Sequence, residues 1–596
     1  MSFEHRGFVR KRTICLFVVF VVLFLALTGR LVYVHVLRNQ DYKDWAKRIR
    51  FRDIPIPASR GSIYDRIGRP LAVSIEASGI YANRGEVNDP ERAAAEVAAV
   101  LGCEPDCIER KFSGKTTIVW LARQIDPRQA HKVTALEPKL RGVGIERDPK
   151  RIYPGRALAA HILGFTSVKY DRSGRLKTEG VEGLECVLDA KLTGREGLLR
   201  AELDARRRVI PETRHLAREP VDGKNVYLTI DIGIQHIAEV ALARVAETYD
   251  PQKACAVVMD PHTGEILALA NYPSYDPNDA RSSASKVWRN SAVADLYEPG
   301  STLKLVTAAA ALNEGTSPHR TIADCTGQHK IKGGRIRCSL HHPFMSGHGA
   351  VDMYKIIRHS CNIGAACLAF RVGSKKLYAY EKAFGLLDRI DAGFGCEAVG
   401  HMMPPDKWRP IRLGNVGFGQ GIAVTPLQMA AAYAVVANGG VYVQPRIVRE
   451  IRGADGSVEV PFTTNVVRRV ISRETAAQLT EMLVGCVEEG TGKNAGIPGR
   501  TVAGKTGSAQ IPKPEGGYEQ DQVVASFIGF APAYSPRLVI AVVVTRPRDS
   551  HYGAKVAAPA FREIAEKALW YLKVPADALE EEDLKHRQDG DARDLV

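Results

Sequence analysis

The sequence predicts an α+β protein with a single N-terminal transmembrane helix, an extended mixed module and a larger domain built on an antiparallel sheet. Three observations predict this fold class: a long uncharged apolar run near the start, β-rich hairpins at both ends of the second half, and helical patterns between those hairpins. The chain has 596 residues. At ~100–200 residues per domain, that length suggests more than one folded domain.

The first element is an apolar segment at residues 13–37. Residues 13–29 (TICLFVVFVVLFLALTG) carry no charge, and apolar side chains resume after Arg30. This length is enough for a helix to cross ~30 Å of hydrocarbon. A cleaved signal peptide is the alternative, but its apolar region would be shorter and would end at a small-residue cleavage site, whereas LVYVHVLRNQ follows here. The sequence therefore favours an uncleaved membrane anchor.

Basic residues precede this segment at positions 6, 10, 11 and 12. The positive-inside rule leaves residues 1–12 in the cytoplasm and exports the chain beyond about residue 40. We therefore expect a single-pass protein whose chemistry takes place outside the cytoplasm. The net charge of +15 does not point to nucleic acid, because the sequence has no zinc-finger spacing, no aromatic RNA-binding motif and no basic region followed by heptads.

The mixed module covers residues 38–223, and the larger domain covers residues 224–575. The module is rich in charge, glycine and short apolar runs, with one long helical pattern at Pro90–Leu101. Around Asn225 the pattern changes, because VYLTIDIGIQHIAEVALARVAE predicts a strand, a turn and an amphipathic helix capped by Asp231. We place the domain boundary there.

Two hairpins begin and end the larger domain, at residues 254–270 and 525–545. Four helical patterns lie between them, at residues 303–312, 352–372, 426–438 and 473–489. This order predicts a sheet covered by helices on two faces. The charged tail at residues 576–596 has no aromatic residue and is predicted to be disordered.

The first candidate catalytic motif is Ser-x-x-Lys, at Ser301 and Lys304. It follows a Pro-Gly turn and starts a strong helical pattern, so the two side chains share one face. A serine hydroxyl is a poor nucleophile at neutral pH, and a lysine whose charge is disfavoured by burial or by neighbouring cations can act as its base. An ordinary helix N-cap would look the same. Ser283 and Lys286 share the spacing, but no helical pattern follows them.

Two further motifs come later in the chain. Ser360 and Asn362 form a Ser-x-Asn motif, in which a second hydroxyl can relay a proton and an amide can hold a substrate backbone and position the lysine. The third motif is a Lys-Thr-Gly-Ser string: Lys505, Thr506, Gly507 and Ser508. A lysine and two hydroxyls on an edge strand make a carboxylate site, and a glycine there lets a substrate approach the backbone closely.

Each motif is weak alone, but Ser-x-x-Lys, Ser-x-Asn and Lys-Thr-Gly in this order form the active-serine pattern of penicillin-binding proteins and serine β-lactamases. On these motifs the chain resembles class B penicillin-binding proteins along nearly its whole length, and it most resembles the cell-division type, penicillin-binding protein 3. Further strings of that family lie at residues 60–72, 153–165, 180–185, 417–428 and 438–440. One departure is Ser508, where the family usually has threonine, and the hydroxyl is retained.

The resemblance implies a role for each motif residue. Ser301 would attack the penultimate D-alanine carbonyl of a donor stem peptide, with Lys304 as the general base. Ser360 would relay protons, and Asn362 would bind the peptide amide. The resemblance also implies a carboxylate site and an oxyanion hole. Lys505, Thr506 and Ser508 would hold the terminal carboxylate, with Gly507 giving access, and the backbone N–H groups of Ser301 and Ser508 would face the oxyanion.

The resemblance also implies a setting. The chain would be a peptidoglycan D,D-transpeptidase of the bacterial inner membrane that serves septal wall synthesis during cell division, binds β-lactams and needs no cofactor. Residues 38–223 would be its pedestal, or dimerisation, module. No glycosyltransferase module fits before residue 225, so a SEDS-type glycosyltransferase and other divisome membrane proteins are expected partners. No PASTA repeats are visible, which argues against a sporulation-type relative.

Other functions fit the same motifs. The enzyme could serve side-wall elongation, or it could be a D,D-carboxypeptidase or β-lactamase, in which water replaces the acceptor amine. The large first module and the anchor favour a wall-building enzyme. A non-catalytic β-lactam sensor or divisome scaffold is disfavoured, because only about a dozen residues precede the helix and a sensor needs a cytoplasmic signalling domain.

The eleven cysteines show no repeated CxxC, and we expect most of them to be small buried core residues. Cys325 and Cys338 lie near His341, His342 and His348 in the sequence. A disulfide across a short loop, free core thiols and a zinc site are the three interpretations, and the loose spacing makes zinc the weakest of them.

Overall fold

The computed structural model describes residues 3–113, 118–136, 140–170, 176–204, 210–338, 347–513 and 515–577. The tail from residue 578 onward, His341 and His342 lie outside the described residues. The chain forms two compact units, which we call the first unit (residues 1–59 and 194–222) and the second unit (residues 60–193 and 223–596). These units do not coincide with the domains expected from the sequence, whose boundaries stay predictions.

The first unit contains the apolar N-terminal helix. Helix α1 (Phe3–Val32) continues into a π-helical turn, η1 (Tyr33–Leu37). Residues 7–37 are long and apolar enough to cross a membrane, and their large side chains are exposed, as lipid-facing groups would be. This helix fits a single-pass membrane anchor. The unit also holds α2 (Asn39–Arg50) and a three-stranded sheet in the order β1 (Phe51–Ile56), β10 (Gly197–Glu202) and β11 (His215–Arg218).

The second unit begins with the elements of the mixed module. These are β2 (Ile63–Tyr64), β3 (Pro70–Ile75), β4 (Ser78–Asn83), α3 (Pro90–Leu101), α4 (Pro105–Phe112), β5 (Ile118–Ile125), α5 (Pro127–Thr134), β6 (Val143–Arg147), β7 (Lys150–Ile152), α6 (Ala160–Leu163), β8 (Thr166–Tyr170), β9 (Leu176–Gly180), α7 (Gly183–Val187) and α8 (Asp189–Leu192). Helix α3 lies where the sequence predicts it, and together with α4 and α5 it packs on the sheet β5-β4-β6 through a small separate core.

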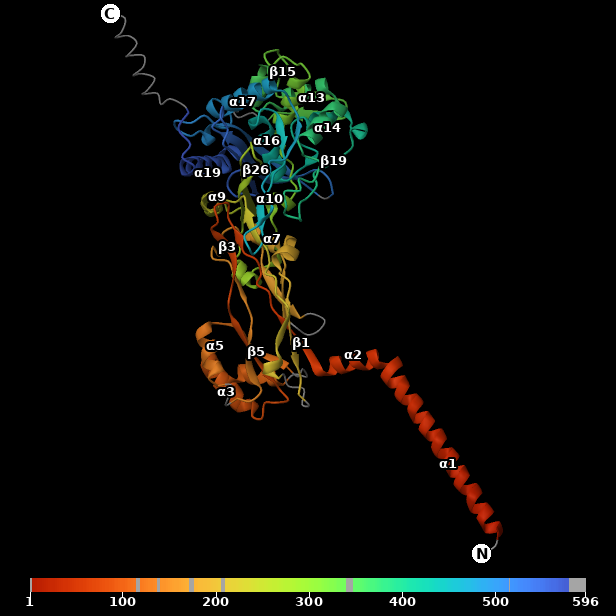
Figure 1. Cartoon of the computed structure of the whole chain (residues 1–596). Helices are drawn as coiled ribbons and strands as arrows, with labels where there is room; N and C mark the ends of the chain where they lie inside the picture. Colours follow the sequence, from red (N-terminus) through yellow and green to blue (C-terminus); the bar gives the residue numbers. More distant parts are fainter. Residues whose placement is uncertain are drawn as a thin grey trace, which may run out of the picture. The chain divides into compact units, whose positions relative to one another are not determined.

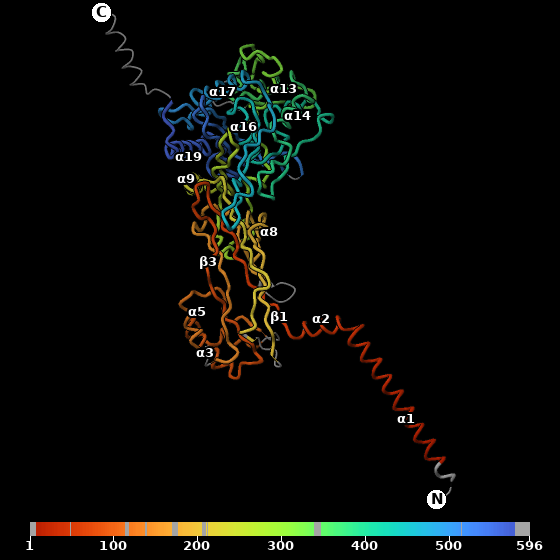
Figure 2. The backbone as a smooth tube through the Cα atoms, in the orientation of Figure 1, coloured from red at the N-terminus to blue at the C-terminus, as the bar shows by residue number. Residues whose placement is uncertain are grey.

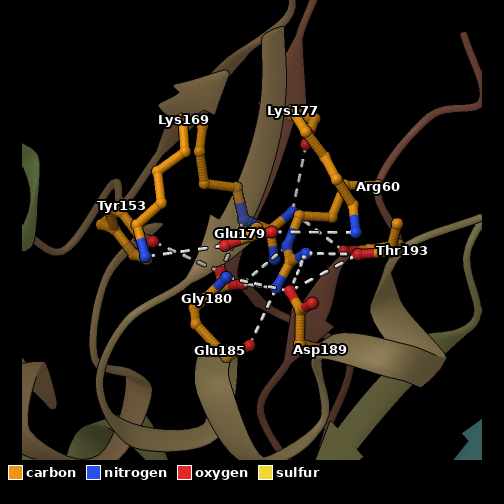
Figure 3. Close-up of polar contacts among 12 residues, drawn as sticks. Arg60, Tyr153, Lys169, Lys177, Glu179, Gly180, Glu185, Asp189 and Thr193 are labelled. Atoms are coloured by element: carbon orange, nitrogen blue, oxygen red, sulfur yellow. Dashed lines mark hydrogen bonds and ion pairs between the residues drawn. The ribbon is translucent and has the colours of Figure 1, made fainter. Parts of the chain in front are cut away.

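A buried ion network joins three strings of the sequence (Figure 3). Glu185 is fully buried and accepts hydrogen bonds from Arg60 and Arg151, both at 2.7 Å, while the hydroxyl of Tyr153 donates to it at 3.3 Å. A carboxylate removed from water needs such partners, because an unpaired buried charge is strongly destabilising. The strings at residues 60–72, 153–165 and 180–185 therefore meet at one side chain.

A second sheet links this module to the larger domain. It has the order β23-β22-β12-β2-β3-β7, in which β12 (Asn225–Leu228), β22 (Val448–Arg452) and β23 (Val458–Val460) belong to the chain after residue 223. Strand β12 pairs in parallel with β2, with Val226 opposite Ile63. Helix α9 (Ile232–Tyr249) follows β12 and is capped by Asp231, as the sequence predicts.

The core of the larger domain is a five-stranded antiparallel sheet in the order β14-β13-β27-β26-β25. Its strands are β13 (Lys253–Met259), β14 (Ile266–Tyr272), β25 (Ala503–Pro512), β26 (Tyr518–Ala531) and β27 (Leu538–Thr545). Both hairpins predicted from the sequence are confirmed. Strand β25, which carries the Lys-Thr-Gly string, is an edge strand.

Helices cover both faces of this sheet. The helices of the domain, besides α9, are α10 (Ser291–Ala294), α11 (Lys304–Asn313), α12 (Met353–Arg358), α13 (Asn362–Val372), α14 (Ser374–Ala383), α15 (Pro410–Val416), α16 (Pro426–Ala437), α17 (Arg473–Glu488), α18 (Gly553–Val556) and α19 (Ala558–Tyr571). Its short strands are β15 (Ala323–Cys325), β16 (Gln328–Ile331), β17 (Gly334–Arg337), β18 (Gly349–Val351), β19 (His401–Met402), β20 (Ile422–Ala423), β21 (Val441–Val443) and β24 (Val466–Arg469).

Alternate residues of each central strand point to opposite faces. Val257 and Ala541 belong to the core that contains α11 and α16, whereas Ala256 and Val542 belong to the core that contains α9 and α19. Figure 1 shows α16 and α19 on either side of β26, and Figure 2 shows α9 beside α19. The predicted α+β sheet with helices on two faces is confirmed.

One helix prediction is wrong. The pattern at residues 352–372 is two helices, α12 and α13, separated by a turn at Ser360, whose φ of 58° lies in the left-handed region. In a continuous helix the Ser360 carbonyl would accept from the N–H of Gly364. Instead, Lys304 donates to that carbonyl at 2.7 Å, and the Gly364 N–H donates to the sulfur of Cys361 at 3.3 Å. Contacts from distant residues override the local helical pattern.

Candidate active site

A cleft of about 710 Å³ brings the three motifs together. Its lining includes the motif residues Ser301, Ser360, Asn362, Thr506 and Ser508. Ser283, the other serine with the Ser-x-x-Lys spacing, follows the 3₁₀ turn η3 (Pro277–Ser282) and is not among the described residues that line the cleft.

Ser301 lies in a 3₁₀ turn, η5 (Gly300–Leu303), directly before α11. Gly300 has a φ of 53°, and its N–H donates to the carbonyl of Gly419 at 3.0 Å. The contact is too close for a side chain, because a Cβ on Gly419 would lie 1.9 Å from the Gly300 carbonyl oxygen. Tyr433 donates from its hydroxyl to the carbonyl of Thr302 at 2.9 Å. The turn that presents Ser301 is thus held by the string at residues 417–428 and by α16.

Lys304 is at the centre of the hydrogen-bond network. Its Nζ lies 3.0 Å from Ser301 Oγ, 3.0 Å from Ser360 Oγ, 2.7 Å from the Ser360 carbonyl and 2.7 Å from Asn362 Oδ1. The hydroxyl of Ser360 lies 2.9 Å from that of Ser301. The two serine hydroxyls and the amine are therefore in mutual contact.

The surroundings of Lys304 disfavour its charge. The residue is 1% exposed, and no carboxylate pairs with it within the described part of the chain. Burial, and secondarily the positive charge of Lys505, lowers the pKa of Lys304 to about 7. A substantial fraction of this amine is neutral at physiological pH, which an exposed lysine would not be.

Lys505 lies on β25 and is fully buried. Its Nζ donates to Thr491 Oγ1 at 3.2 Å and to Thr506 Oγ1 at 3.3 Å, and the two threonine hydroxyls lie 2.9 Å apart. Burial lowers the pKa of Lys505. Its hydrogen-bond partners are hydroxyls and a carbonyl, so this cation has no counter-ion among the described residues.

Thr491 was not found from the sequence. It lies between α17 and β25 and lines the cleft beside Thr506. The string EEGTGKNAG around it has turn composition, but nothing in that string marks a lysine partner. Only the packing of α17 against β25 shows the relation.

Gly507 and Ser508 complete the edge strand. A Cβ on Gly507 would lie 2.4 Å from Ser526 Oγ on β26 and 3.0 Å from Thr302 Cγ2 in the Ser301 turn, so β26 and this turn together leave little room for a side chain there. Ser508 is exposed in the cleft, and its hydroxyl accepts from the N–H of Gly553 at 2.9 Å. The hydroxyl of Ser508 thus ties α18 to β25.

The cysteines differ from the expectation. Only four of the eleven are buried, so the expectation that most lie in the core is wrong: the buried ones are Cys255, Cys325, Cys361 and Cys486. Every cysteine lies in the described part of the chain, and none of them forms a disulfide. Cys325 and Cys338 have their sulfurs 3.6 Å apart, and His348 and Cys361 lie beside them. The sequence did not single out Cys361 as a member of this group.

Comparisons with known proteins agree with this geometry. The penicillin-binding protein transpeptidase domain matches residues 254–566, and the penicillin-binding protein dimerisation domain matches residues 55–228. Stage V sporulation protein D of Bacillus subtilis is 34% identical over 95% of this chain and 86% of that protein. The peptidoglycan D,D-transpeptidase FtsI of Escherichia coli is 29% identical over 97% of this chain and 94% of that protein.

Among solved structures, penicillin-binding protein 3 of Mycobacterium tuberculosis in complex with aztreonam aligns with a TM-score of 0.67. It is 30% identical, over 88% of this chain and all of that chain. The lack of visible PASTA repeats argued against a sporulation-type relative, yet the similarity to a sporulation protein extends along nearly the whole chain. Both domains, their order and these similarities lead to one conclusion. The chain belongs to the class B penicillin-binding proteins, a family of serine-type peptidoglycan D,D-transpeptidases.

Proposed function

We propose that this chain cross-links peptidoglycan stem peptides through an acyl-enzyme on Ser301. The observation that carries the proposal is the contact of the buried Lys304 amine with the hydroxyls of Ser301 and Ser360, both at 3.0 Å. A base within hydrogen-bond reach and with a pKa near 7 is what a serine nucleophile requires.

The hydrogen bonds of Lys304 explain how its lone pair is aimed. A neutral amine has two N–H donors and one lone pair. The Ser360 carbonyl and the Asn362 Oδ1 can only accept, and they are its closest partners, at 2.7 Å each. With both donors directed to these oxygens, the lone pair faces the two hydroxyls. Asn362 therefore acts as a positioning residue for the base as well as a candidate ligand of the substrate amide.

The reaction then proceeds in two steps. The Ser301 proton passes to Lys304 as Ser301 Oγ bonds to the penultimate D-alanine carbonyl carbon. That proton returns through Ser360 Oγ to the leaving nitrogen, and the terminal D-alanine departs. An amine of a neighbouring stem peptide next attacks the ester carbon, loses its proton to the same network and releases Ser301 with the cross-link formed.

The substrate carboxylate fits the site around Lys505. Lys505 is a buried cation whose neighbours among the described residues are hydroxyls and not carboxylates. The terminal carboxylate of the stem peptide would supply the missing negative charge. Because β25 is an edge strand, a stem peptide can lie along it as an added strand, with the N–H groups of Ser301 and Ser508 directed at the oxyanion. β-Lactams acylate Ser301 as mimics of the same peptide.

The cellular setting is part of the proposal. Basic residues before the apolar helix favour a cytoplasmic N-terminus and a catalytic domain outside the inner membrane. Likeness to the cell-division type favours a role at the septum, with a SEDS-type glycosyltransferase and other divisome proteins as partners.

Labelling with a fluorescent penicillin tests the proposal. The full-length chain in detergent should label in the wild type and in Ser283→Ala, the matched control, and should not label in Ser301→Ala. Labelling that survives Ser301→Ala, or that is lost in Ser283→Ala alone, contradicts the assignment. A stem-peptide substrate with an added acceptor amine separates the alternatives, because a carboxypeptidase or β-lactamase gives the hydrolysed product and a transpeptidase gives the new amide.

A further inference from the structure

Three cysteines and one histidine form a cluster next to the proposed catalytic network. Their ligand atoms all lie within 4.8 Å of one another: Cys325, Cys338, His348 and Cys361. Cys361 stands between Ser360 and Asn362 in the Ser-x-Asn motif. Two of the four residues, Cys325 and Cys361, are fully buried.

Backbone pairing brings the four residues together from distant parts of the chain. Strand β15 pairs with β18 so that Cys325 lies opposite Gly349, which places His348 beside it. Cys338 follows β17 and donates its N–H to the carbonyl of Gly327 at 3.0 Å. Gly347 has no room for a side chain, because a Cβ there would lie 1.8 Å from the Cys325 carbonyl oxygen. The cluster is therefore a feature of the fold rather than a chance meeting of side chains.

Three of the distances between ligand atoms match the edges of a tetrahedral zinc site, and the others are at most 4.8 Å. Sulfur–sulfur distances are 3.6 Å between Cys325 and Cys338 and 3.7 Å between Cys338 and Cys361, and Cys325 Sγ lies 3.4 Å from His348 Nδ1. Zinc bonds of ~2.3 Å to sulfur and ~2.0 Å to nitrogen give tetrahedron edges of about 3.8 Å and about 3.5 Å. A disulfide would require about 2.05 Å and would leave the third thiol unpaired.

The sulfurs also have donors that suit thiolates. The N–H of Ile363 donates to Cys338 Sγ at 3.5 Å, and the N–H of Gly364 donates to Cys361 Sγ at 3.3 Å. Both N–H groups belong to the first turn of α13, whose 11 residues favour negative charge at this end. Three soft thiolates and one imidazole match zinc better than magnesium or calcium.

We propose that these four residues bind a structural zinc ion that holds the Ser360–Asn362 turn in place. All four positions of a tetrahedral site are filled by the protein, so the ion has no open position for substrate and plays no part in the chemistry. Its effect is on geometry. The left-handed conformation of Ser360, with a φ of 58°, requires support from its surroundings, and fixing the next residue provides it.

This positioning role rests on the proposed function, because it matters only if Ser360 and Asn362 orient Lys304. The metal itself does not depend on that assignment. Metal content and penicillin acylation are therefore measured separately, so that the failure of one proposal can be told from the failure of the other.

Metal analysis of the full-length chain, purified in detergent under reducing conditions without chelator, tests the site. We expect about one zinc ion per chain in the wild type and in the control variant Cys367→Ser, which changes a cysteine within α13 outside the cluster. The zinc content of Cys325→Ser and of Cys361→Ser should be lower by about tenfold or more. Cobalt exchanged into the wild type should give the intense visible absorption of tetrahedral thiolate ligation, which does not require any variant to fold. Absence of both zinc and the cobalt spectrum, or a Cys325–Cys338 disulfide found by mass mapping, overturns the proposal.

Removal of the ion tests the positioning role. Chelation should slow acylation by fluorescent penicillin about tenfold, and added zinc should restore the rate. Unchanged acylation after complete zinc removal overturns the positioning role and leaves the site standing. Zinc-loaded chain that fails to label at all overturns the proposed function instead.

Discussion

At the scale of single residues, Lys304 and Lys505 show how burial gives two identical side chains different tasks. The hydrogen-bond partners of Lys304 among the described residues are uncharged oxygens, and burial with the nearby charge of Lys505 lowers its pKa to about 7. Lys505 is also buried, and its hydroxyl neighbours carry no charge. One amine is therefore suited to accept a proton, and the other to hold a carboxylate.

The first prediction concerns pH. Because Lys304 must be neutral to take the Ser301 proton, the acylation rate with a fluorescent penicillin should rise about tenfold per pH unit below 7 and level off above it. The sign follows from the lowered pKa, since the active form is lost as pH falls through 7. The acylation rate is measured at pH values from about 5.5 to about 8.5, a range that includes this pKa.

The control for this prediction is a matched substitution. Lys304→Arg keeps a permanent charge, so it should slow acylation by about 10²–10⁴ on the plateau above pH 7 and should remove the rise with pH. Lys286→Arg, the same change in the other Ser-x-x-Lys copy, should keep the wild-type profile. A wild-type acylation rate that does not level off between pH 7 and about 8.5 would contradict a base with a pKa of about 7.

The second prediction concerns Thr491, which contacts both Lys505 and Thr506. Thr491→Val keeps the shape but removes the hydroxyl, and one lost hydrogen bond of ~1.4 kcal/mol corresponds to about tenfold weaker binding. We expect the loss in the concentration dependence of acylation rather than in its limiting rate, because Lys304 is untouched. Thr491→Ser should restore binding; equal losses in both variants would contradict a hydroxyl role.

At the scale of elements, the site depends on strand and turn contacts that a local pattern does not encode. The five-stranded sheet, its two hairpins and α11, α16 and α17 follow from apolar periodicity and were predictable. The break between α12 and α13 was not, because Lys304 competes for the Ser360 carbonyl from 56 positions away. Motif order identified the proposed catalytic residues, whereas Thr491 and Cys361 are defined only by the contacts of the folded chain.

The third prediction tests the packing around Gly507, between β26 and the Ser301 turn. In Gly507→Ala the new Cβ would lie 2.4 Å from Ser526 Oγ and 3.1 Å from the Pro299 carbonyl. A shift of the strand away from these atoms is expected, and a displacement near 1 Å can cost about 10² in acylation rate.

A double variant separates this clash from general damage. Ser526 Oγ is buried without a hydrogen-bond partner in the described structure, so Ser526→Ala should change acylation less than about twofold. Adding Ser526→Ala to Gly507→Ala removes the nearest clash and should recover part of the rate. If the double variant is no faster than Gly507→Ala, contact with Ser526 is not the cause.

At the scale of the whole molecule, the strings of the mixed module matter because they carry buried charge. Arg60, Tyr153 and Glu185 are far apart in sequence and meet in one network, while β2 of the same module pairs with β12 of the larger domain. Loss of the network should therefore lower the stability of the larger domain as well as that of the module. The family resemblance indicated these strings, but it did not reveal that they share one carboxylate.

The fourth prediction follows from that network. Glu185→Ala leaves Arg60 and Arg151, whose side chains are 8% and 3% exposed, without their shared carboxylate, and removing one partner of a buried pair costs ~3–5 kcal/mol. Glu179→Ala is the control, because Glu179 is 37% exposed and pairs with Lys169 and Lys177 at only 3.6 and 3.8 Å, which is worth ~0–1 kcal/mol. Thermal unfolding should show a Tm lower by roughly 5 °C or more for Glu185→Ala and little change for Glu179→Ala. Penicillin labelling after heating should be lost at a correspondingly lower temperature in Glu185→Ala, because β2 and β12 share a sheet. If the module of Glu185→Ala melts early while its labelling keeps the heat resistance of the wild type, the two parts unfold independently.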